Sequence, residues 1–166
     1  MAEKFILVNE GLEHTGIYGF SDVYEYIYRW FKEESYGVVE EKYNEKVSGT
    51  TRDISVEWKC SKGLSDYFKA DISVRIEAGG ISDVEVEIDG KKKKMNKGRL
   101  RIEFKGTLIQ DPDSKWDTSP FYRFLRDAYN KYIIPARVET QEDKVMGDVK
   151  DVKEGIKSFL ELQGRR

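Results

Sequence analysis

The chain has very few of the residues from which many catalytic and metal sites are built. It contains one cysteine, Cys60, and one histidine, His14, among its 166 residues. A single cysteine excludes an intrachain disulfide, and one cysteine with one histidine cannot supply the usual ligands of a zinc site. We therefore expect no bound metal and no other cofactor, and we expect Cys60 to be a buried, small apolar residue because it continues the apolar alternation of its segment.

Long apolar runs and a strong net charge are also missing. The run at residues 5–8 is too short for a signal-peptide core or a membrane-spanning helix, so we expect no transmembrane segment and a cytoplasmic location. The net charge of −2 gives no overall attraction to nucleic acid or to a membrane. Contact with either would need a local charged patch.

The residues that are present indicate a folded protein with one core. The chain is 39% hydrophobic and 36% charged, and it has eight Phe, ten Tyr and only three Pro. This composition argues against disorder, and 166 residues is an ordinary length for one domain. Because no internal repeat or low-complexity linker interrupts the chain, we predict a single domain over residues 1–166.

The apolar pattern predicts the order of the elements. A short strand at residues 5–10 precedes a helix at 21–35, whose apolar residues recur at spacings of three and four. From residue 38 to residue 108 apolar and polar residues alternate, which indicates an antiparallel meander with one buried face. Two C-terminal helices follow: one capped by Ser119 and stopped by Pro135, the other at residues 141–162. The predicted class is α+β, a two-layer domain with a six- to seven-stranded antiparallel sheet packed on these three helices.

Asp89-Gly90 predicts a two-residue hairpin turn, because a type I′ turn needs positive φ at both positions. Counting outward from this turn places Lys92 opposite Glu87 and Lys94 opposite Glu85, where opposite charges are favourable. The same count puts Lys91 and Lys93 on the apolar face, which requires their stems to cover apolar surface. We expect a further turn at residues 96–98.

The alternative interpretation of this segment is an anionic-surface site. Residues 91–105 contain eight basic residues and one acid, and phosphates or an anionic membrane could bind them. No aromatic residue lies among the lysines to stack on bases, so nucleic acid is not an expected partner. The candidate contacts are Lys91, Lys92, Lys93, Lys94, Lys97 and Arg99.

Two acids break the pattern at residues 38–47, where Glu41 and Glu45 share a predicted face with Tyr43. Buried carboxylates could orient a ligand or do acid and base chemistry. The interpretation we favour is an edge strand that resists aggregation. Asp111, Asp113 and Asp117 depart from the spacing of a calcium loop, so we interpret them as a polar turn.

The order of strand, helix, meander and terminal helices resembles the helix-grip proteins of the START-like superfamily over nearly the whole chain. The break at Pro135 and the second terminal helix depart from the single long helix of that family. The resemblance implies a curved sheet wrapped around a C-terminal helix, and roles in enclosing apolar ligands, sensing small molecules, or binding and transfer. These roles follow from the fold analogy alone.

We therefore expect a non-enzymatic binding module that holds an apolar small molecule or lipid between the sheet and the C-terminal helix. The alternative is an interaction or scaffold protein with a filled core that contacts another protein or an anionic surface through residues 91–105. An enzyme ranks last, because no nucleophile or cofactor accompanies the acids. The candidate ligand contacts are Glu41, Tyr43, Glu45, Trp58, Phe68, Ile72, Val86 and Phe104.

Overall fold

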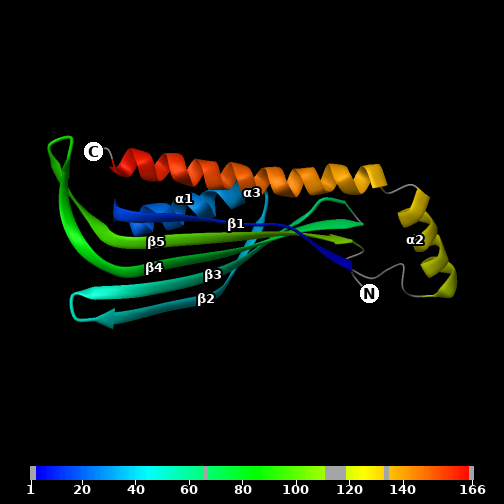
Figure 1. Ribbon diagram of the computed structural model, residues 1–166, viewed down its shortest axis with the longest axis horizontal. Coiled ribbons are helices and arrows are strands. Elements are labelled where there is room, and N and C mark those ends of the chain that lie inside the picture. The colour runs from blue at the N-terminus through cyan, green and yellow to red at the C-terminus, as the bar shows by residue number, and fades with distance from the viewer. Residues whose placement is uncertain (1–2, 66, 111–118, 133–134, 165–166) are drawn as a thin grey trace.

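The computed structural model describes residues 3–65, 67–110, 119–132 and 135–164. It is an α+β structure in which one antiparallel sheet carries helices on one face (Figure 1). The elements are, in chain order, β1 (Glu3–Tyr18), α1 (Phe20–Glu33), β2 (Gly37–Ser48), β3 (Thr51–Gly63), β4 (Phe68–Ile88), β5 (Lys91–Gln110), α2 (Pro120–Tyr132) and α3 (Pro135–Gly164).

The sheet has five strands in the order β1-β5-β4-β3-β2. The first strand therefore pairs with the last, and β2 forms an edge, as one interpretation of its acids predicted. The prediction of six to seven strands is wrong, because residues 68–88 form one strand and residues 91–110 another.

The long strands β4 and β5 contain one irregularity and one segment that was predicted to be a turn. The pairing of β4 with β5 shifts between Gly79 and Ser82, and Gly80 adopts φ 59° while its N–H donates to an Asp53 carboxylate oxygen at 2.7 Å. A bulge with a left-handed glycine lets a strand turn sharply without ending. The predicted turn at residues 96–98 lies inside β5, which continues through it along both neighbouring strands.

The hairpin between β4 and β5 has the predicted register. Ile88 lies opposite Lys91, and the pairing continues outward through Glu87 and Lys92. Asp89 has φ 51° and Gly90 has φ 78°, as a type I′ turn requires. The end of this hairpin curls toward the C-terminal end of α3 (Figure 1).

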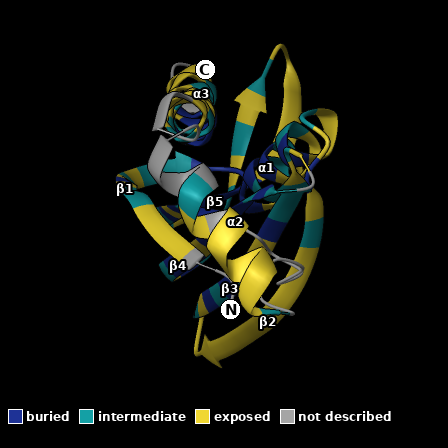
Figure 2. Ribbon diagram, turned by 90° about the vertical axis from the view of Figure 1, so that its right-hand side faces the viewer, coloured by how far each residue is buried: buried dark blue, intermediate teal, exposed yellow. Residues whose placement is uncertain are grey.

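Helices α1 and α3 lie side by side on the same face of the sheet (Figures 1 and 2). The last helix begins at Pro135 rather than near residue 141, since proline is well suited to a first helical turn. It packs mainly on β1 and β5, where a Cβ at Gly106 would come within 3.1 Å of Val145 and 3.3 Å of Val149 of α3. A glycine at this position allows the helix to approach the sheet closely.

The core lies between the sheet and these two helices. Cys60 is buried in it, as predicted, and burial raises the pKa of its thiol to about 12. Tyr36 donates a hydrogen bond of 2.7 Å to Asp148 of α3, and both side chains are buried. This bond ties α3 to the segment between α1 and β2.

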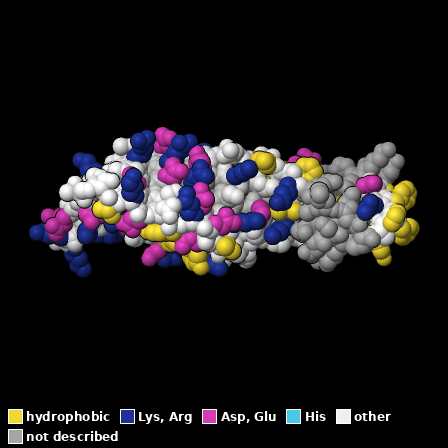
Figure 3. Space-filling view, turned by 90° about the horizontal axis from the view of Figure 1, so that it is seen from below, with side chains coloured by type: hydrophobic (Ala, Val, Ile, Leu, Met, Phe, Trp, Pro, Cys, Tyr) yellow, Lys and Arg dark blue, Asp and Glu magenta, His cyan; other side chains and the backbone are white. Residues whose placement is uncertain are grey.

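The other face of the sheet carries charged side chains of both signs, interspersed over the surface (Figure 3). Helix α2 begins as predicted, with the Ser119 hydroxyl accepting a hydrogen bond from the N–H of Tyr122 at 3.3 Å. Its apolar side chains Phe121, Phe124 and Leu125 are exposed. The reason is that α2 lies beyond the end of the sheet (Figure 1). Among the described helices, none is both long and apolar enough to span a membrane.

Candidate functional site

A cleft of about 410 Å³ lies where the curled hairpin approaches α1 and the C-terminal part of α3. It is lined by Asp22, Glu25, Tyr26, Arg29, Ile88, Lys93, Met95, Phe159 and Leu162. The volume falls within the range of small-molecule sites, roughly 300 to 1,000 Å³. We refer to this space as the hairpin cleft.

The floor of the hairpin cleft is apolar and partly aromatic. The rings of Tyr26 and Phe159 are stacked, with centroids 4.9 Å apart. Met95 is buried, whereas Leu162 is 58% exposed. A Cβ on Gly155 would collide with the Tyr26 hydroxyl, so the glycine makes room for this stack.

The rim of the hairpin cleft is charged. Lys93 Nζ lies 3.0 Å from Asp22 Oδ2, which joins β5 to the first turn of α1. Lys93 and Met95 both line the cleft, and the Lys93 ammonium group binds the Asp22 carboxylate. Glu25 and Arg29 of α1 lie on the same rim. The cleft thus offers an apolar floor and charges of both signs.

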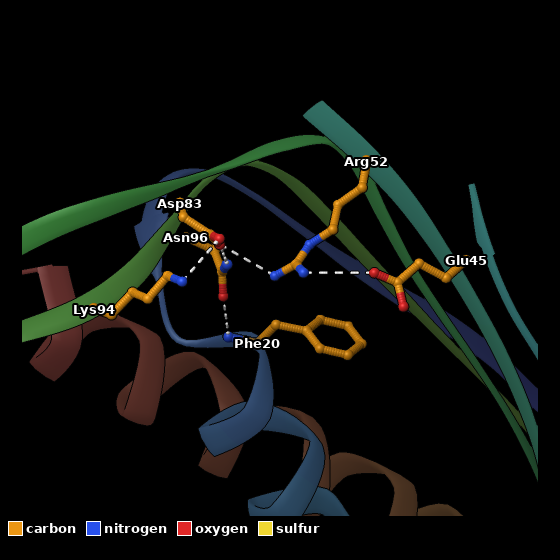
Figure 4. A network of polar contacts seen from close by, with 6 residues as sticks. All are labelled: Phe20, Glu45, Arg52, Asp83, Lys94 and Asn96. Atoms are coloured by element: carbon orange, nitrogen blue, oxygen red, sulfur yellow. Dashed lines mark hydrogen bonds and ion pairs between the residues drawn. The ribbon is translucent and has the colours of Figure 1, made fainter. Parts of the chain in front are cut away.

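A polar network holds the base of the hairpin against α1 (Figure 4). The Asn96 side chain accepts a hydrogen bond from Phe20 N–H at 2.9 Å and donates one to Asp83 at 3.0 Å. Asp83 also pairs with Arg52 at 3.2 Å and with Lys94 at 3.3 Å. Because α1 has no side-chain cap from its own N-cap residue, Gly19, Asn96 supplies one from β5.

The predicted start of α1 and both predicted charge pairs are corrected by the structure. The N-cap of α1 is Gly19, and the helix begins at Phe20 rather than at residue 21. Lys92 lies opposite Glu87 but forms no ion pair among the described residues, and Lys94 lies opposite Glu85 but pairs with Asp83, two residues away on β4. A diagonal neighbour lies within reach of a long side chain.

The eight predicted ligand contacts do not form one group, although Glu41, Trp58 and Phe104 line the same groove. Trp58, Phe68, Ile72 and Phe104 are core residues, and Val86 is half-buried near the end of β4. Glu41, Tyr43 and Glu45 are exposed on β2. None of the eight lines the hairpin cleft. Their role as ligand contacts stays a prediction.

The six predicted anionic-surface residues are all exposed along β5. Lys93 and Lys94 have carboxylate partners, Asp22 and Asp83. Among the residues that the structure describes, Lys91, Lys92, Lys97 and Arg99 form no ion pair. The basic surface is therefore partly neutralised at its centre.

Several residues of the hairpin cleft belong to patterns in the sequence, but these patterns do not show that the residues lie together in the fold. Tyr26 and Phe159 lie on the predicted apolar stripes of two helices, and Met95 lies in the basic segment. The curl of the hairpin brings them together, and no local pattern specifies that curl.

Comparison with known proteins gives no assignment, since no family model and no curated protein matches the chain. Within the described part of the chain, no group of three His, Cys, Asp or Glu side chains could hold a metal ion. Asp111, Asp113 and Asp117 lie outside the described residues.

Proposed function

We propose that the protein is a non-enzymatic binding protein that holds an amphiphilic small molecule in the hairpin cleft. The observation that carries this proposal is a single cleft lined by the apolar side chains of Tyr26, Met95 and Phe159 and by the Asp22–Lys93 ion pair. Ligand sites typically combine an apolar lining with a few polar groups that fix orientation. An apolar tail would lie on the floor, and the polar end would meet the charged rim.

The arrangement of the elements supports the same proposal. The sheet is antiparallel, its hairpin curls toward a long C-terminal helix, and the hairpin cleft lies between them. This arrangement supports the START-like resemblance. We keep that resemblance, and with it the role of a small-molecule sensor or carrier, as part of the proposal.

A second candidate function is favoured by one observation on the basic segment. Lys91 and Lys92 at the hairpin turn are exposed and form no ion pair within the described part of the chain. They could contact an anionic protein or membrane surface, and such binding would weaken strongly with added salt. Binding to the hairpin cleft would depend on salt much less.

Titration with the fluorescent probe 1-anilinonaphthalene-8-sulfonate tests the cleft. This probe combines an apolar ring system with one negative charge, so it matches the floor and the cationic groups of the rim. In the Leu162→Asp variant we expect roughly tenfold weaker binding, because the new carboxylate would place an unpaired charge against the probe.

The matched control is Val47→Asp, which makes the same kind of change at a 69% exposed residue of β2, outside the hairpin cleft. We expect its probe affinity to stay within about twofold of wild type, a difference of less than half a kcal/mol. Equal effects of the two substitutions would contradict a probe site in the cleft.

A further inference from the structure

A second group of side chains lies outside the hairpin cleft, where α1 faces β2 and β3. We call it the Glu40 cluster, and it consists of Tyr24 and Tyr28 of α1, Glu40 and Tyr43 of β2, and Trp58 of β3. Glu40 lies opposite Trp58 and Tyr43 opposite Val56 in the pairing of β2 with β3. Directly opposite residues share a face, so Glu40 and Tyr43 lie on the same side as the buried residues of β3.

A β-bulge creates this arrangement. The register of β2 shifts between Glu40 and Lys42, so Glu41 is the extra residue. Glu41 instead lines a groove with Glu57 and Ser73 on the charged face of the sheet. Strict alternation predicted that Glu41 shares a face with Tyr43. Because of the bulge, Glu40 shares that face instead.

The Glu40 carboxylate is held in place but not neutralised. Its Oε1 atom accepts hydrogen bonds from the Tyr24 hydroxyl at 2.7 Å and from Trp58 Nε1–H at 3.2 Å. Both donors are uncharged, since burial and the Glu40 carboxylate raise the pKa of Tyr24 to about 12. Within the described residues Glu40 forms no ion pair. A fixed negative charge therefore stands at the surface.

Tyr24 and Trp58 meet this charge through their O–H and N–H groups, and Trp58 is buried, so the exposed rings of the cluster are those of Tyr28 and Tyr43. Tyr24 and Tyr28 both contact Trp58 edge-on, with centroids 4.8 and 6.0 Å from it. Tyr28 is 42% exposed and Tyr43 is 48% exposed. Lys32 Nζ lies 5.6 Å from the centroid of Tyr28, within the range of a cation–π contact. The Tyr28 ring of the cluster thus already contacts a cation of the protein, the Lys32 ammonium group.

We propose that the Glu40 cluster binds an alkylated ammonium group, such as trimethylammonium. Aromatic faces attract such a cation through their quadrupoles, and the carboxylate adds a full opposite charge. A quaternary ammonium needs no hydrogen-bond acceptor, so it does not compete for the hydrogen bonds that hold Glu40. A hard metal ion would need more oxygen ligands than this single carboxylate supplies.

Titration with tetramethylammonium chloride, followed by the indole N–H resonance of Trp58, tests the proposal. Sodium chloride at equal ionic strength is the control for general charge effects. We expect a saturable shift in the wild-type protein, and about tenfold weaker binding for Glu40→Gln because the opposite charge is lost. Tyr28→Leu weakens binding severalfold, whereas Tyr28→Phe retains the ring and the affinity.

Glu41→Gln is the matched control, since it removes the same charge from the next residue, on the other face of the sheet. Its affinity for tetramethylammonium stays at the wild-type value. The proposal is overturned if sodium produces the same shift, if no saturation occurs, or if Glu41→Gln weakens binding as much as Glu40→Gln. Parallel titrations with choline and with a trimethyllysine peptide show whether a small molecule or a modified protein binds more tightly.

Discussion

At the scale of single residues, the position of Tyr26 in the hairpin cleft depends on Gly155. We predict that Gly155→Ala displaces the Tyr26 ring, because the added methyl group would collide with its hydroxyl. The gain in helix propensity, about 1 kcal/mol, is then offset by the loss of a stacked pair worth about 0.5–1.5 kcal/mol. Urea unfolding should show little change in stability, and the anilinonaphthalene probe should bind severalfold more weakly.

Gly147 provides the control on the same helix. No described atom lies within 4 Å of the position of an added Cβ, so Gly147→Ala should stabilise the protein by about 0.5–1 kcal/mol without changing probe binding. Equal stabilisation and equal probe affinity in the two variants would show that Gly155 does not position Tyr26.

Residue identities could be predicted from the sequence where a local rule governs them. Asp89-Gly90 determines the hairpin register because few residues tolerate positive φ, and Cys60 follows the alternation of its strand. Glu40 was missed because a bulge leaves no distinct sequence signal, and one extra residue exchanges the two faces of a strand. The alternation therefore predicted Glu41, rather than Glu40, as the acid that faces the aromatic residues.

At the scale of elements, α1 depends on a cap that comes from β5. We predict that Asn96→Ala destabilises the protein by about 1–3 kcal/mol, because the buried N–H of Phe20 loses its acceptor and Asp83 loses a donor. Lys94→Ala removes an exposed ion pair with the same Asp83 and should cost at most about 1 kcal/mol. Urea denaturation midpoints measure both, and equal losses would contradict the capping role of Asn96.

The types of the elements followed from the sequence better than their ends did. The helices and the long alternating segment are specified by the period of their apolar residues, a signal to which many residues contribute. The strands continue through the glycines at 79–80 and through the predicted turn at residues 96–98, where Asp53 binds the Gly80 N–H and Asn96 binds the Phe20 N–H of α1. Glycine and asparagine mark bends here, and the strands continue through them.

At the scale of the whole molecule, the core makes stability sensitive to alkaline pH. Burial raises the pKa of Cys60 to about 12 and raises the pKa values of Tyr18 and Tyr36 above the usual value for tyrosine. In the unfolded chain these groups lose their protons near pH 9 for Cys60 and near pH 10 for the tyrosines. The unfolded state then binds fewer protons, so stability is full below about pH 9 and falls as the pH rises.

We predict that Cys60→Ala removes one of these contributions. Between pH 9 and pH 11 the wild-type protein should lose stability faster than the variant, by up to about 1.4 kcal/mol per pH unit. Urea unfolding at a series of pH values measures the two slopes. Parallel slopes would mean that the thiol is deprotonated equally in the folded and unfolded states.

The overall architecture could be predicted to the level of an antiparallel sheet with three helices. The hairpin cleft could not, because it depends on how far the β4–β5 hairpin curls and on where α3 ends relative to α1. Both are properties of long-range packing. Phe124 illustrates the same limit, since its helical stripe resembles a core stripe but lies on a helix beyond the sheet.

Native mass spectrometry of the protein purified from its own cells tests the central claim most directly, together with extraction of lipids and metabolites from the same sample. The proposed function predicts one small amphiphilic molecule per chain, which is lost in the Leu162→Asp variant and retained in Val47→Asp. A wild-type protein that carries no small molecule, or only a macromolecular partner, would contradict the hairpin cleft as a ligand site and would favour the basic surface at Lys91 and Lys92.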